Sequence, residues 1–92
     1  MEFKWIDADL IDKKVTGKTS RFFVDNDEIC EVFKFDSGEC FTFARSMKRI
    51  FEVDFDSDCT LDMAKAIIEE KFHQLSIAYN AWWYKHGRKF VE

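Results

Sequence analysis

A single long run of apolar residues at helical spacing limits most strongly what this chain can fold into. The run lies within residues 61–86, and its members are three or four positions apart: Leu61, Ala64, Ile68, Phe72, Leu75, Tyr79 and Trp82. Thr60 is a suitable N-cap, Asp62 suits the helix dipole, and Gly87 is a natural stop. The pattern therefore predicts one amphipathic helix of about 35 Å, long enough to cross a small sheet.

The first half of the chain has the turn residues and the alternation of an antiparallel sheet. The clearest hairpin joins two phenylalanine-rich segments through "DSGE", where Gly38 is free to take a positive φ. The alternation places Phe33 and Phe35 on the same face of the first strand, and it places Phe41 and Phe43 on the same face of the second. The expected elements are strands over 2–5, 21–24, 28–35 and 40–44, turns over 16–20, 25–28 and 36–39, a short helix or loop over 7–15, and a helical turn over 45–51.

These elements predict an α+β fold, in which a small antiparallel sheet, an N-terminal meander, packs against one long C-terminal helix. The length of 92 residues corresponds to a single domain, 1–92. No apolar run of about 18 residues is present and the first ten residues do not resemble a signal peptide, so we expect a cytosolic protein. Three cysteines without a C-x-x-C pair are expected to be reduced, mostly buried thiols.

Two short stretches have part of a ligand-binding motif. "VTGKTS" resembles the end of a phosphate-binding loop, but Asp12 stands where the first glycine belongs, and a polar turn is the simpler interpretation. "DFDSDCTLD" has the acid spacing of a calcium loop, but Cys59 replaces its glycine and Lys65 its bidentate glutamate. We therefore expect no metal site and no cofactor, although a calcium- or magnesium-binding protein remains a third alternative.

No arrangement of residues predicts an enzyme. His73 and His86 are the only histidines, and neither has a ligand or a catalytic partner at a recognisable spacing. We therefore expect a protein that acts by binding.

Four acids at alternate positions are the most unusual feature of the sequence. Glu52, Asp54, Asp56 and Asp58 would project from one face of a strand over 52–58, about 6.7 Å apart. Neighbouring phosphates of a DNA strand are separated by roughly twice their 3.4 Å axial step, which is close to this spacing. The acids of a turn, Asp25, Asp27 and Glu28, would extend the same pattern. The alternative is that the four acids are only the solvated face of an outer strand.

A second candidate surface lies at the end of the predicted helix. Trp82, Trp83 and Tyr84 are consecutive and point about 100° apart, so they cannot all face one core. Trp82 continues the apolar stripe, whereas Trp83 and Tyr84 are candidates for a self-interface or for packing under the tail 88–92. A homodimer or a protein interaction module is the function that this surface predicts.

The short, proline-free, phenylalanine- and lysine-rich chain with the acidic stretch "EVDFDSD" resembles the small early proteins of T-even phages, which include anti-restriction DNA mimics. That resemblance implies a non-enzymatic inhibitor that blocks a host nucleic-acid-binding protein, such as a restriction nuclease, in the host cytoplasm. The expected partner is a DNA-binding protein or nuclease with a basic groove. Direct contact with nucleic acid is not expected, because the net charge is −4. Association with a membrane is not expected, because no apolar run is long enough to span one.

Overall fold

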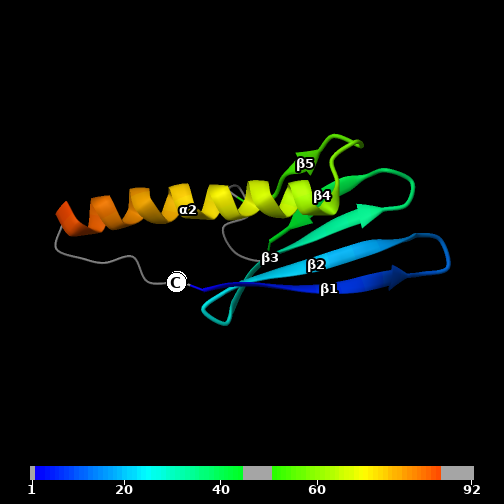
Figure 1. Cartoon of the computed structure of the whole chain (residues 1–92), viewed down its shortest axis with the longest axis horizontal. Helices are drawn as coiled ribbons and strands as arrows, with labels where there is room; N and C mark the ends of the chain where they lie inside the picture. Colours follow the sequence, from blue (N-terminus) through cyan, green and yellow to red (C-terminus); the bar gives the residue numbers. More distant parts are fainter. Residues whose placement is uncertain (1, 45–50, 86–92) are drawn as a thin grey trace.

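The computed structural model describes residues 2–44 and 51–85, and in the last helix it describes side chains as far as Leu75. These residues form a five-stranded antiparallel sheet in the order β1-β2-β3-β4-β5, with α2 packed against it (Figure 1). The elements are β1 (Phe3–Ile11), β2 (Thr16–Val24), β3 (Asp27–Phe35), β4 (Cys40–Phe43), β5 (Asp54–Phe55) and α2 (Leu61–Lys85). The predicted α+β meander with one C-terminal helix is confirmed.

The first hairpin differs from the sequence-based prediction. A helix or loop over 7–15 and a turn over 16–20 are both wrong, because β1 and β2 pair without interruption from Phe3↔Val24 to Ile11↔Thr16. The chain reverses instead at 12–15, where the Asp12 N–H donates to the Val15 carbonyl at 3.0 Å. Pairing along a complete ladder outweighs the polar composition of both segments. Because "TGKTS" lies in β2, it does not form a phosphate-binding loop.

The other two turns of the meander lie where the sequence predicts them. Asp25 and Asn26 both have positive φ, 50° and 75°, which is the backbone of a tight two-residue hairpin turn. Gly38, at φ 119°, closes the β3–β4 hairpin. The register shifts between Phe22 and Phe23, where Ile29 of β3 is left without a partner, so β3 has a bulge near the first of these turns.

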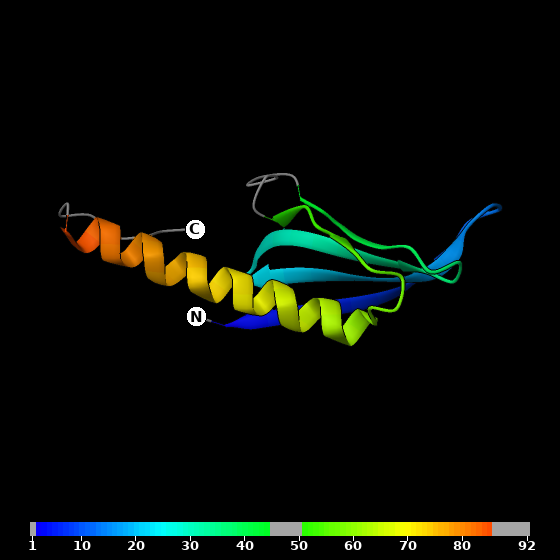
Figure 2. The same ribbon diagram turned by 90° about the horizontal axis from the view of Figure 1, so that it is seen from above.

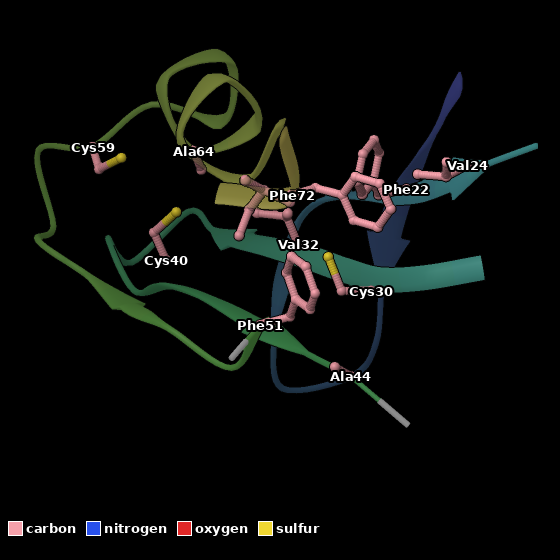
Figure 3. Close-up of a cluster of buried hydrophobic side chains, with 11 residues drawn as sticks. Phe22, Val24, Cys30, Val32, Cys40, Ala44, Phe51, Cys59, Ala64 and Phe72 are labelled. Atoms are coloured by element: carbon pink, nitrogen blue, oxygen red, sulfur yellow. The ribbon is translucent and has the colours of Figure 1, made fainter. Parts of the chain in front are cut away.

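The core lies between α2 and one face of the sheet (Figure 3). On α2, Ala64, Ile68 and Phe72 are buried, as the predicted apolar stripe requires. The Phe72 ring lies 6.1 Å from the Phe22 ring and 5.9 Å from the Phe51 ring, centroid to centroid. The buried apolar set is Phe22, Val24, Cys30, Val32, Cys40, Ala44, Phe51, Cys59, Ala64, Ile68 and Phe72. Removal of this apolar surface from water is the main stabilising contribution to the fold.

Polar contacts join α2 to β1, the strand at one edge of the sheet. The Trp5 indole N–H donates to Glu69 Oε2 at 2.6 Å, and Lys65 Nζ lies 2.7 Å from Asp7 Oδ1. The Lys65 ammonium also lies 5.5 Å from the centre of the Trp5 ring. These contacts fix the position of the helix across β1.

The hairpin phenylalanines share a face, as predicted, but that face is turned away from α2. The register pairs Phe33 with Phe41 on β3 and β4, and their rings stack with centroids 5.2 Å apart. Phe35 packs edge-on against Phe41 at 5.3 Å. Gly17 lies opposite Phe35, where an added Cβ would meet the Lys34 carbonyl oxygen at 2.3 Å, so a side chain does not fit at this position.

The helix continues past the end of the sheet (Figures 1 and 2). The overhang carries Trp82, Trp83 and Tyr84, but the predictions for these side chains lie outside what the structure describes. The predicted helical turn over 45–51 is outside it too, except for Phe51, which is fully buried. Within 2–44 and 51–85, no helix is long and apolar enough to cross a membrane.

Candidate protein-binding edge

The acidic segment is held at the β5 side of the sheet by anchors at both of its ends. Buried Phe51 precedes the segment and buried Cys59 follows it. The buried hydroxyl of Thr42 donates to the Phe51 carbonyl and accepts the Val53 N–H at 2.7 Å. At the far end, Lys34 Nζ donates to the Ser57 carbonyl at 2.6 Å, and the Cys59 N–H donates to the Asp56 carbonyl at 2.9 Å. The segment therefore has a defined path along the sheet.

The acids themselves are all exposed, but they do not form one straight row. Val53 and Phe55 are half-buried against the core, and Glu52, Asp54 and Asp56 alternate with them in solvent. The predicted strand over 52–58 is wrong, because only Asp54 and Phe55 pair with β4. Residues 57 and 58 form a turn that leads to α2, so Asp58 leaves the extended line. Three acids therefore keep the spacing of about 6.7 Å that an extended chain gives.

The carboxylates of this segment form no ion pair within the described residues. The two ion pairs found there join Arg21 to Glu28 and Lys65 to Asp7. Lys34 lies beside the segment, but its ammonium hydrogens go to the Ser57 and Gly38 carbonyls. Its charge weakens the local negative field without neutralising any one acid.

Glu39 joins this set, although sequence reasoning missed it. Cys40 pairs with Phe55, so the preceding residue lies beside the start of the acidic turn. Glu39 and Asp54 line one shallow hollow. A hydrogen bond from the Ser37 hydroxyl holds the pKa of Glu39 below its usual value, with a smaller contribution from Lys34. The sequence would have indicated Glu39 only if the register of the β3–β4 hairpin had been extended to a fifth strand. We call Glu39, Glu52, Asp54, Asp56 and Asp58 the acidic edge.

The acids predicted to extend the row lie elsewhere. Asp25, Asp27 and Glu28 surround the β2–β3 turn, at the opposite end of the sheet from the turn that holds Asp58. A nine-residue strand is about 30 Å long, so the β2–β3 turn lies far from the turn that holds Asp58. Asp25 accepts the Glu2 N–H at 2.8 Å, and Glu28 is paired with Arg21. The continuity of these acids with the row stays a prediction.

The described residues offer no cluster of three or more His, Cys, Asp or Glu side chains that could hold a metal ion. His73 is exposed on α2. All three cysteines are buried free thiols, and burial raises the pKa of Cys30 to about 12. Burial also raises the pKa of Cys40, and neighbouring Cys59 adds to this effect. Thiols with raised pKa values are poor nucleophiles at neutral pH.

Comparison of the chain with protein-family models, with curated proteins and with solved structures finds no match. The resemblance to phage anti-restriction proteins therefore stays a prediction, and the geometry of the acidic edge is what an argument about function has to use.

Proposed function

We propose that the protein is a non-enzymatic inhibitor that inserts its acidic edge into the basic nucleic-acid-binding groove of a partner protein. One observation carries the proposal. The acids of the edge stay unpaired in the described structure, whereas Asp7 and Glu28 each have a cation of the same chain as partner. Carboxylates without an ion pair attract a basic groove more strongly than paired ones, because intramolecular pairing reduces the attraction.

The backbone anchors support the same function. A flexible acidic segment would lose conformational entropy when it binds, and that loss opposes binding. Here Phe51 and Cys59 are buried at the two ends, and Thr42 and Lys34 hold the backbone between them. Glu52, Asp54 and Asp56 are thereby presented at a fixed spacing close to that of successive phosphates. A host restriction nuclease that binds DNA in the cytoplasm fits this chemistry as the partner.

The proposal is tested by inhibition of DNA cleavage with a panel of purified restriction nucleases, including modification-dependent ones. The test variant carries Glu52→Gln, Asp54→Asn, Asp56→Asn and Asp58→Asn. The control carries Glu2→Gln, Asp9→Asn, Asp12→Asn and Glu70→Gln, which removes the same total charge from exposed positions elsewhere.

We expect the test variant to lose inhibition by about tenfold or more and the control to keep it. Inhibition by the unaltered protein should also weaken steeply as salt rises through physiological strength, because exposed charges are screened. Equal inhibition by the two variants would disprove a role for the acidic edge, and so would inhibition that is indifferent to salt.

The runner-up function, an interaction module at the tryptophan-rich end of α2, has one observation in its favour. The helix extends to Lys85, past the end of the sheet (Figure 2). Replacing Trp83 and Tyr84 by serine should change the sedimentation of the protein if that end binds a second copy. Unchanged sedimentation at high concentration would remove this alternative.

A further inference from the structure

The face of the sheet opposite α2 presents apolar side chains from four strands. They are Ile6, Ala8 and Leu10 from β1, Phe23 from β2, Phe33 and Phe35 from β3, and Phe41 and Phe43 from β4. We call this face of the sheet, with these apolar residues and the charged residues beside them, the outer face. Ile6 is 41% exposed and Phe43 is 47% exposed. In the part of the chain that the structure describes, no helix or strand packs on the outer face, because α2 lies against the other one.

Charge divides the outer face into two halves. Among the described residues, β1 and β2 contribute Lys4 and Arg21 to it and no acid. As far as the structure describes the chain, the β3–β5 half contributes Glu28, Glu31 and Asp54 and no base. The ion pair between Arg21 and Glu28 lies where the two halves meet. A surface with an apolar centre, one basic side and one acidic side is complementary to itself.

We propose that the outer face binds a second copy of this chain. A twofold axis parallel to the strands would bring the basic half of each copy onto the acidic half of the other, which is the arrangement that an isologous interface requires. The same rotation places β4 of one copy over β1 of the other, and the strand register puts Phe43 at the level of Ile6. Two sheets pack face to face in this way at about 10 Å.

The area of the outer face sets the strength of the dimer. Three strands of nine residues and one of four cover about 500 Å² in outline, at about 3.3 Å per residue and 4.8 Å between strands. Two copies would therefore bury about 1,000 Å², at the low end of specific interfaces. The dimer should be weak and should form only as the protein concentration rises.

The inference does not rest on the proposed function. Asp56 and Asp58 lie past the end of β5 and outside the outer face, so an altered outer face leaves these two acids unchanged. Glu52 and Asp54 lie at its rim, where a charge pair contributes little to affinity.

Sedimentation equilibrium over a concentration series tests the proposal. The apparent mass of the unaltered protein should rise from 11.0 kDa, the mass of one copy, toward twice that value as the concentration rises into the high micromolar range. Ile6→Ser and Phe43→Ser should each weaken the dimer by about tenfold. The matched control is Ile67→Ser, because Ile67 is 46% exposed but lies on α2. Circular dichroism establishes that each variant is folded.

A second variant tests the charge argument. Arg21→Glu turns the basic half acidic, so it should weaken the dimer and should do so most at low salt. A chain that stays monomeric throughout the series would overturn the proposal. A dimer that Ile67→Ser weakens as much as Phe43→Ser would overturn it too, because the contact would then lie on the helix. If dimerisation fails while the acidic-edge variant still loses inhibition, the proposed function stands without this interface.

Discussion

The two faces of the sheet both carry a cluster of aromatic rings, and they differ in what covers them. At the inner face, Phe22 and Phe51 pack against Phe72 of α2 with centroids about 6 Å from its ring, and all three are fully buried. On the outer face, Phe33, Phe35 and Phe41 make contacts of similar length, from 5.2 to 6.4 Å, yet remain half-buried. Ring contact alone therefore does not distinguish a core from a surface. The helix makes the difference, because it removes water from the second side of the inner rings.

The largest difference should appear when one ring is removed from the inner face. Phe72→Ala is expected to lower the free energy of unfolding by about 3–5 kcal/mol, because it leaves a cavity among three other rings. Urea denaturation followed by circular dichroism measures this loss. A loss below about 1 kcal/mol would mean that α2 does not cover the sheet as described.

The matched change on the outer face should cost less. Phe33→Ala is expected to lower the free energy of unfolding by about 1–2 kcal/mol, because the ring keeps part of its surface in water before the change. The same denaturation experiment gives the comparison directly. Equal losses for Phe33→Ala and Phe72→Ala would show that the outer face is covered in solution, as the dimer predicts at high concentration.

A titratable group on the inner face should make stability depend on alkaline pH. Burial raises the pKa of Cys30 from 9.0 to about 12, so the folded state holds this proton more tightly than the unfolded state. The stabilisation is complete below pH 9 and is lost as pH rises toward 12, at no more than about 1.4 kcal/mol per pH unit. In Cys30→Ala, the free energy of unfolding should fall less steeply over this window. Identical slopes for the two proteins would contradict the burial of this thiol.

The smallest effect should come from the exposed ion pair that joins α2 to β1. Hydrogen bonds from Lys65, and then from Ser20, hold the pKa of Asp7 below its ordinary 3.8. The folded state therefore favours the charged form, and this stabilisation is present above pH 3.8 and lost as pH falls through the lowered pKa. Asp7→Asn should cost less than about 1 kcal/mol at pH 7 and nothing at strongly acidic pH. A cost that persists in strong acid would point to packing instead.

The elements that depend on local pattern are those that the sequence predicts well. The helix follows from apolar residues three and four apart and from the Thr60 cap, whose hydroxyl accepts the Met63 N–H at 3.1 Å. The β3–β4 hairpin follows from alternation around Gly38, where a positive φ is required. Exposure of Glu52, Asp54 and Asp56 follows from their alternation with Val53 and Phe55. In each case, neighbours in the sequence supply the interaction that fixes the conformation.

Other features were decided only when distant segments met. The polar sequence from 7 to 20 shows no clear alternation, and it forms parts of two strands because β1 and β2 pair along their full length. Asp7 and Glu28 acquire cations from Lys65 and Arg21 through pairing and helix docking, whereas the acids from Glu52 to Asp58 acquire none among the described residues. Glu39 joins the acidic edge because β5 pairs with β4. Alternation shows which residues share a face, but the docking of α2 decides which face becomes the core, because only that contact excludes water from both sides of a ring.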